Sequence, residues 1–183
     1  MRALHRREAA EIDARFPKLL RRVGGYNINM IDDAGHNMAH LLVGSEGTLG
    51  FFTAVELDLQ PIPPDRVLGI CHFPSLHAAM AATKAIVALD PAAVELVDRI
   101  MIELARDIAL FRPVIERFVE GAPAALLLVE FAGADGEENR LRLRRLEELM
   151  GDLGHPGAVV RAVDPAFQRA VWEVRQHGLN IMM

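Results

Sequence analysis

The sequence predicts an α+β protein: a ferredoxin-like module in which helices cover an antiparallel sheet, preceded by a small piece of another domain. Two observations support this prediction. Strand-like and helix-like patterns alternate from Asp65 onward, and no glycine-rich phosphate loop follows any of the predicted strands. The alternative for such alternation is a doubly wound parallel sheet, and that fold binds its nucleotide at such a loop.

The first 60 residues carry fewer regular patterns. Residues 1–22 are a basic lead-in with loose helical spacing, which Pro17 interrupts. Residues 37–42 predict a short helix that leads into a glycine-rich turn. Residues 54–60 alternate apolar with charged or polar side chains, which is the period of a half-buried strand.

Four strands are predicted beyond the proline-rich stretch 61–64, which continues neither sheet nor helix and therefore marks a domain boundary. The third strand is an uninterrupted aliphatic run, typical of a central strand buried on both faces. Glu130 lies inside this run and is the charge expected to need a buried partner. The predicted strands are 66–73, 92–97, 124–131 and 158–163.

Helices between and after these strands are indicated by their capping residues. Ser75 caps the first helix, and Asp135 begins a capping box for the third. Asp164 caps the last, with Pro165 at its first position, and Gly154 is placed to end the third.

The other helical expectations concern a packing face and a linker. The second helix is predicted at 99–108, and residues 111–121 are expected to link it to the third strand. Helical periodicity gives the first helix one apolar face: Leu76, Ala79, Met80, Thr83 and Val87.

Composition excludes several classes of protein. Hydrophobic residues make up 51% of the 183 residues but aromatic residues only 5%, so the core must be mostly aliphatic. The net charge of −5 argues against a nucleic-acid partner, because phosphate binding needs a basic surface. The single cysteine, Cys71, has no second cysteine to pair with and is expected to be buried and inert.

No stretch of the sequence approaches the ~20 apolar residues of a membrane span, and the N-terminus lacks the apolar centre of a signal peptide. We therefore predict no membrane span and a cytoplasmic location.

The glycine-rich turn is GSEGTLG at 44–50. Backbone N–H groups in such a turn, with the hydroxyls of Ser45 and Thr48, suit the phosphate of a nucleotide cofactor. The turn lacks the lysine of a Walker loop, and Ser45 does not lie in GxSxG. From spacing alone, two interpretations stay open: a cofactor contact, or a purely structural turn between a helix and a strand.

No metal site is predicted. His36 and His40 have the i, i+4 spacing of helical ligands but lack the glutamate and third ligand of a zinc protease. The remaining histidines downstream are assigned to loop positions: His72, His77, His155 and His177.

The segment VGSEGTLGFFT, after VGGYNI and before a predicted strand and a proline-rich exit, resembles the FAD-linked oxidases. These flavoproteins of the vanillyl-alcohol oxidase superfamily include glycolate oxidase subunits, D-lactate dehydrogenases and D-2-hydroxyglutarate dehydrogenases. The segments AAVELVDRIMIE, ALLLVEFAG and AVWEVRQHG are similar to landmarks of that family's cap domain, in the same order. The family's earlier pyrophosphate loop and later histidine-rich metal motif do not match any segment of this sequence.

The resemblance implies three parts: a basic lead-in at 1–22, the tail of an FAD-binding domain at 23–61, and a partial cap domain at 65–183. It therefore implies a fragment. The residues that it places against FAD are Gly44, Ser45, Glu46, Gly47, Thr48 and Gly50, with Tyr26 and Asn27 nearby.

Trp172 and Arg175 share one stripe of the last helix, while a second stripe is expected in the core: Phe167, Ala170, Val171 and Val174. From the sequence alone, Arg175 is a surface arginine stacked on Trp172. The resemblance implies a different role, in which Arg175 of a WxxR motif clamps the carboxylate of a 2-hydroxy acid.

The resemblance also implies the function: an FAD-dependent enzyme that oxidises a 2-hydroxy acid to the 2-oxo acid and passes electrons to a separate acceptor. An iron-sulfur protein or domain is a candidate acceptor, and a homodimer is a candidate assembly. No residue is assigned as the catalytic base. The competing hypothesis is a non-catalytic ferredoxin-like module that binds or dimerises through a sheet edge.

Overall fold

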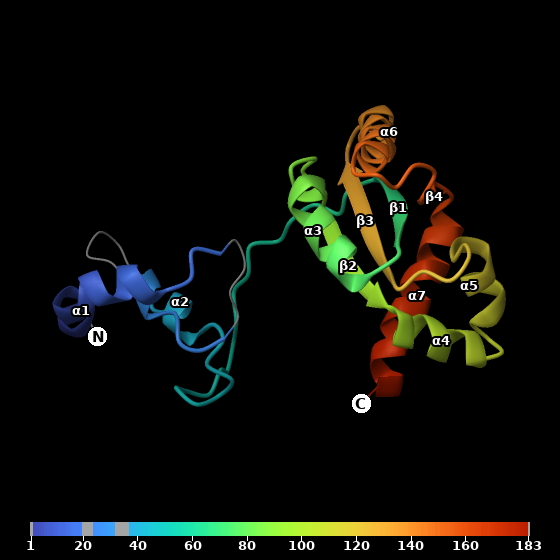
Figure 1. Cartoon of the computed structure of the whole chain (residues 1–183). Coiled ribbons are helices and arrows are strands. Elements are labelled where there is room, and N and C mark those ends of the chain that lie inside the picture. The colour runs from blue at the N-terminus through green and yellow to red at the C-terminus, as the bar shows by residue number, and fades with distance from the viewer. Residues whose placement is uncertain (1, 20–23, 32–36, 183) are drawn as a thin grey trace. The chain divides into compact units, whose positions relative to one another are not determined.

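The computed structural model describes residues 2–19, 24–31 and 37–182. The chain divides into two compact units, Met1–Gln60 and Pro61–Met183, which are coloured blue to teal and teal to red in Figure 1. The smaller unit contains α1 (Arg2–Arg15), the 3₁₀ helix η1 (Ile28–Met30) and α2 (Ala39–Leu42). The larger unit contains β1 (Asp65–Phe73), α3 (Leu76–Val87), β2 (Ala93–Asp98), α4 (Arg99–Asp107), α5 (Arg112–Phe118), β3 (Ala125–Gly133), α6 (Gly136–Asp152), β4 (Val159–Ala162) and α7 (Pro165–Met182).

The smaller unit has little core. Helix α1 ends before Pro17, and α2 lies where a short helix is predicted. The strand predicted at 54–60 is wrong, because this segment is extended but pairs with no strand in the described part of the chain. Its apolar side chains Val55, Leu57 and Leu59 are 67%, 71% and 86% exposed. Alternation alone does not make a strand, since backbone groups need a partner edge.

The larger unit is built on a four-stranded sheet with the order β2-β3-β1-β4. Each neighbouring pair is antiparallel, which confirms the α+β class and excludes a parallel wound sheet. Strand β3 lies between β1 and β2, so the connection through α3 joins strands that are not neighbours. Seven consecutive residues of β3 are buried, as its aliphatic run predicts for a central strand.

Both faces of the sheet are covered, because alternate residues of β1 and β3 point into two separate cores. Helices α3 and α6 pack on one face, while α4, α5 and α7 form the layer on the other (Figure 1). The largest fully buried side chains of the first core are Phe73, Phe131, Ile86, Leu127, Leu143, Leu146 and Met150, and those of the second are Leu68, Ile70, Ile115, Leu126 and Leu128.

The predicted helix caps are confirmed. The Ser75 hydroxyl accepts from Ala78 N at 3.1 Å, and the Asp135 carboxylate accepts from two N–H groups of the first turn of α6. Asp164 caps α7 in the same way. Gly154 follows α6 with φ +85°, a conformation that glycine adopts without strain.

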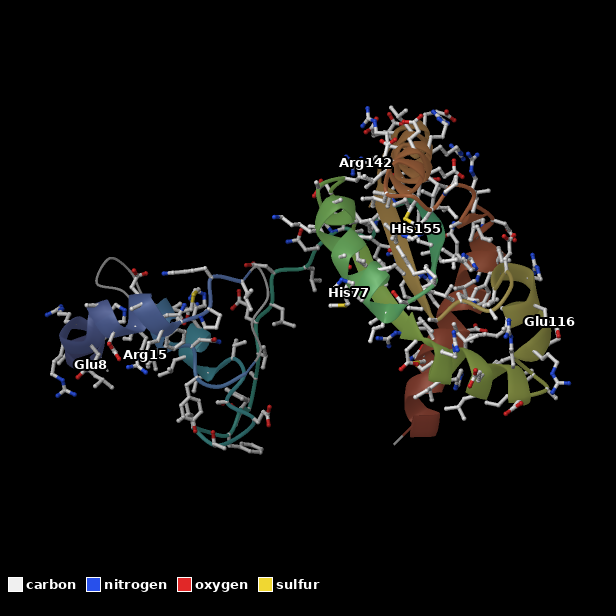
Figure 2. The ribbon with its side chains drawn as sticks, in the orientation of Figure 1. Glu8, Arg15, His77, Glu116, Arg142 and His155 are labelled. Atoms are coloured by element: carbon white, nitrogen blue, oxygen red, sulfur yellow. The ribbon has the colours of Figure 1, made fainter. Side chains whose placement is uncertain are left out.

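The exposed face of α6 carries ion pairs between side chains one turn apart. Arg142, labelled in Figure 2, contacts Glu138 at 3.2 Å one turn away. Arg140 pairs with Glu137 at 3.1 Å in the same manner. Such solvated pairs contribute little stability each, about 0.3–0.5 kcal/mol.

Two helical expectations are wrong. Residues 112–118 form α5 rather than a linker, and proline at the start of this helix is compatible with its first turn. The buried face of α3 is Ala79, Ala82 and Ile86, whereas Met80 and Val87 are more than half exposed. The inner face of α3 therefore combines two small side chains with the large Ile86, which is fully buried.

Three of the histidines assigned to loops lie elsewhere. His72 is buried within β1, where its Nε2 accepts from Glu120 N at 3.1 Å. His77 is exposed on α3, and His177 lies on α7 stacked against Phe111. His155, labelled in Figure 2, does follow α6 in a loop, and its ring forms a T-shaped pair with that of Phe73.

Gly69 allows α6 to approach the centre of β1. A Cβ at this position would lie 2.6 Å from Leu146 Cδ2 and 2.9 Å from Leu143 Cδ1, both in the packed core. We expect Gly69→Ala to lower the free energy of unfolding by about 1–3 kcal/mol in a urea titration. Gly151→Ala is the control, because its Cβ meets nothing within 4 Å and should raise helix stability by about 0.5–1 kcal/mol. Equal effects would contradict this packing.

Burial, with a smaller contribution from the charge of Glu147, raises the pKa of the Cys71 thiol from 9.0 to about 12. The folded state therefore keeps a proton that the unfolded chain loses above pH 9. The stability that the neutral, buried thiol gives to the folded state is complete below pH 9. Between pH 9 and 12 the free energy of unfolding should fall by about 1.4 kcal/mol per pH unit. Urea unfolding should show that slope in the wild type but not in Cys71→Ala. An identical slope in both would assign the effect to other groups.

Candidate functional site

The glycine-rich turn adopts the left-handed backbone that its sequence predicts. Gly44 and Gly47 have φ of +80° and +79°, and Glu46 between them has φ +50°. A side chain with a Cβ is strained in this region, so glycine is required at two of the three positions. The turn begins directly after α2 and holds its shape through local hydrogen bonds.

Tyr26, predicted with Asn27 to lie near FAD, contacts this turn, and Asn27 contacts the segment just before it. The Tyr26 hydroxyl and Thr48 Oγ1 are 2.8 Å apart, and Thr48 Oγ1 donates to Ser45 O at 2.6 Å. The Asn27 amide donates to Val43 O at 3.0 Å, just before the turn. The fold therefore brings together residues separated by about 20 positions in the sequence.

The donors of the turn are only partly available to a ligand. Ser45 N donates to Leu42 O and Thr48 N donates to Ser45 O, so two backbone N–H groups are used internally. The Ser45 hydroxyl is buried and has no hydrogen-bond partner among the described residues. Of the two hydroxyls expected to face a phosphate, only that of Thr48 is exposed.

The outer side of the turn is open. A Cβ at Gly47 or at Gly50 would meet nothing within 4 Å. Beside it is an open hollow, lined by Gly44 and Glu46 of the turn and by Phe52 and residues 54–58 after it. A flat or extended ligand can approach this backbone without displacing a side chain.

Helix α7 presents a row of polar side chains to the sheet, at i, i+4 and i+7. Gln168 Nε2 donates to Arg66 O on β1 and to Ala162 O on β4, both at 2.9 Å. Trp172 Nε1 donates to Glu130 Oε2 on β3 at 3.2 Å.

Arg175 completes the row with an ion pair to Glu95 on β2. The row thus contacts every strand, in the order in which the strands lie in the sheet. A seven-residue advance along a helix is about 10 Å. That distance is comparable with the two strand spacings between β1 and β2, also about 10 Å. We call Gln168, Trp172 and Arg175 the α7 row.

Glu130 has the buried partners that its position in an aliphatic strand requires. Its carboxylate is 3.3 Å from Arg66 Nη1 in addition to the Trp172 contact. The side chain of Glu130 is 10% exposed and that of Arg66 is 44% exposed. A carboxylate buried to this extent is stable only with such charge-assisted donors.

Arg175 is not stacked on Trp172 as a surface arginine. Its Nε contacts Glu95, and both side chains are about a third exposed. The Arg175 side chain also lines a small apolar cavity of about 20 Å³ between the sheet and the helices α4, α5 and α7. The core stripe expected beside it is present, because Phe167, Val171 and Val174 are buried.

Gln168 of the α7 row and Glu95, the partner of Arg175, are not identified in the sequence-based prediction. Gln168 has a detectable signal, since it lies four residues before Trp172 on the same helical face. Glu95 lies in AVELVD, a strand pattern in which one acid occupies a half-buried edge. An acid and an arginine 80 positions apart give no local signal for their pairing.

Other predicted features fall outside these two sites. Among the described residues, no group of three or more histidine, cysteine or acidic side chains could hold a metal ion. His36 lies outside the described residues. In the same part of the chain, no helix is both long and apolar enough to cross a bilayer.

Comparison with known proteins identifies the larger unit. Residues 62–182 match the profile of the C-terminal domain of FAD-linked oxidases. The chain belongs to the FAD-linked oxidase family. FAD is the cofactor of that family, and the predicted family membership is confirmed, while the GSEGTLG turn at 44–50 lies before the matched region.

The similar relatives are named dehydrogenases. D-2-hydroxyglutarate dehydrogenase of Pseudomonas putida is 30% identical over 165 residues, covering 84% of this chain and 16% of the relative. D-lactate dehydrogenase (cytochrome), mitochondrial, of Arabidopsis thaliana is 29% identical, covering 80% of this chain and 24% of the relative. The chain therefore spans less than a quarter of the length of either relative.

A solved structure gives the same fold. An alkyldihydroxyacetonephosphate synthase superposes with a TM-score of 0.50 and 20% identity over 70% of this chain and 26% of its own. At this identity the likeness concerns the fold alone.

The open turn fits the family's cofactor on structural grounds. Gly47 and Gly50 leave the backbone accessible, while the Thr48 hydroxyl is already bonded to Ser45 O and to Tyr26. The Ser45 side chain is buried, so its hydroxyl is less accessible to a ligand than the exposed glycines of the turn.

Trp172→Phe removes the indole N–H from Glu130 and leaves the ring volume largely in place. We expect it to lower the free energy of unfolding by about 1–3 kcal/mol, because the buried carboxylate loses a donor. Circular dichroism must follow the unfolding, since Trp172 is the single tryptophan.

A double-mutant cycle supplies the control. Trp172→Phe should cost clearly less when Glu130 is already leucine, because the hydrogen bond is then absent from both members of the pair. Equal costs in the two backgrounds would assign the effect of Trp172→Phe to packing alone.

Proposed function

We propose that this chain is part of an FAD-dependent enzyme that oxidises a 2-hydroxy acid, of the glycolate, D-lactate or D-2-hydroxyglutarate type, to the 2-oxo acid. The observation that carries the proposal is the family match over residues 62–182, together with relatives named as dehydrogenases of D-2-hydroxyglutarate and D-lactate. When bound, FAD supplies the acceptor for the hydride that leaves the substrate's α-carbon.

In this proposal the smaller unit contributes one wall of the FAD site. The turn residues Gly44, Glu46, Gly47, Thr48 and Gly50 lie against the cofactor, with Tyr26 and Asn27 holding the turn in place. Support comes from the left-handed backbone of Gly44 and Gly47 and from the Tyr26 to Thr48 hydrogen bond. Ser45 acts from inside the turn rather than by direct contact.

The larger unit contributes the substrate's carboxylate site. Arg175 is the clamp, because a guanidinium donates two parallel hydrogen bonds to a carboxylate and stays charged at any working pH. Its place at the end of the α7 row supports this role, since the row fixes the helix against all four strands. The chain's own groups thus bind and orient the substrate.

Further parts of the proposal rest on the resemblance. They are the assignment of residues 23–61 to the tail of an FAD-binding domain and of 65–183 to the cap, a separate electron acceptor of the iron-sulfur type, a homodimeric assembly and a cytoplasmic location. The order β2-β3-β1-β4 supports a ferredoxin-like cap.

The flavin itself reports the activity. The protein that carries this chain, loaded with FAD and mixed anaerobically with glycolate, D-lactate or D-2-hydroxyglutarate, should lose the visible absorbance of oxidised flavin with at least one of them. L-lactate and succinate are the matched controls, because one has the opposite configuration and the other lacks the hydroxyl that is oxidised. An oxidised spectrum with every 2-hydroxy acid would contradict the proposal and favour a binding module.

A further inference from the structure

We propose that Glu95 is a positioning residue: it holds the Nε edge of the Arg175 guanidinium so that the terminal Nη groups are presented to the substrate's carboxylate. This inference rests on the proposed function, which makes Arg175 the carboxylate clamp. It adds a residue from the edge strand β2 to a site otherwise supplied by α7.

The contact is an ion pair on the inner edge of the guanidinium, and the carboxylate oxygen concerned is buried and makes no hydrogen bond among the described residues. Glu95 Oε2 pairs with Arg175 Nε, which is the inner edge of the side chain. A guanidinium carries five N–H donors in a rigid plane, so a carboxylate on the inner edge leaves donors on the terminal edge. Glu95 and a substrate can therefore bind Arg175 at the same time.

The apolar surroundings of Arg175 leave Glu95 as the polar group that can hold its guanidinium. Arg175 lies against an apolar cavity lined by Val97, Val171 and Val174 among others, and none of these three side chains can accept a hydrogen bond. Arginine loses rotamer freedom when it is fixed in one conformation. With Glu95 in place, that cost is met during folding rather than when the substrate binds.

Two effects of Glu95 oppose each other, and the structure indicates which is larger. Its negative charge weakens the attraction of Arg175 for an anionic substrate, whereas its contact orients the clamp. Both side chains are about a third exposed, so water and salt screen the charge effect. The orienting effect depends on a direct contact and is not screened.

Other charged groups around the pair are accounted for. Glu130 faces the same side of the sheet from β3, but its carboxylate is bound by Arg66 and Trp172. Asp98, at the end of β2, caps α4 through Met101 N. Glu95 is thus the acid that pairs with Arg175.

The test is steady-state kinetics of the FAD-loaded protein with the 2-hydroxy acid that reduces its flavin. Glu95→Ala should raise KM by about tenfold or more with kcat little changed, as expected for a contact made equally in ground and transition states. Glu95→Gln should restore part of the loss, because it keeps the shape of the side chain and a polar oxygen beside Nε while removing the charge of the ion pair. Glu103→Ala, an exposed acid on α4, is the matched control and should leave KM unchanged.

A spectroscopic measurement on the full 183-residue chain separates positioning from stability. The Nε–H signal of Arg175 in a ¹H–¹⁵N spectrum should move toward that of a solvated arginine in Glu95→Ala and stay near the wild-type position in Glu95→Gln. A changed melting temperature with unchanged KM would make Glu95 purely structural and overturn the inference. A lower KM in both variants would make Glu95 a competitor and would also overturn it.

Arg175→Met distinguishes failure of this inference from failure of the proposed function. If Arg175→Met raises KM strongly while the flavin stays bound, the clamp holds, and the Glu95 variants decide the inference alone. If Arg175→Met leaves KM unchanged, Arg175 is not the clamp, and both the inference and that part of the proposed function fail.

Discussion

The contact of α7 with all four strands is the constraint on which the larger unit depends. Gln168, Trp172 and Arg175 each bond to a different part of the sheet, so the helix can neither slide by a residue nor rotate without breaking partly buried polar contacts. Apolar burial alone would allow several positions of α7, because hydrophobic contact is not directional. The α7 row selects one of them, and that choice fixes where Arg175 lies.

The sequence predicts most of the larger unit because its signals are local. Ser75, Asp135 and Asp164 predict the starts of helices, because each caps its helix through a hydrogen bond to a residue two or three positions later. The aliphatic run of β3 predicts a central strand. The strand prediction for residues 54–60 is wrong because it depends on a property that is not local. Their alternation describes a strand, but a strand exists only with a partner edge, and pairing is a long-range property.

In the candidate site, too, local features are predictable from the sequence and long-range contacts are not. Gly44 and Gly47 are predictable from sequence because a left-handed turn requires them. That Ser45 turns inward is not, since the direction of one hydroxyl depends on how the turn packs. The pairing of Glu95 with Arg175 is equally hidden, because it joins an edge strand to the last helix. The resemblance to the family points to Arg175, whereas its pairing with Glu95 is visible only in the fold.

We propose that α7 aims Arg175 at a substrate carboxylate while the GSEGTLG turn lies against FAD. A crystal structure of the FAD-loaded protein with the 2-oxo acid product tests it most directly. The account predicts the product's carboxylate on the Nη groups of Arg175, Glu95 still on Nε, and the cofactor along Gly47 and Gly50. Product bound away from Arg175, or FAD away from the turn, would contradict it.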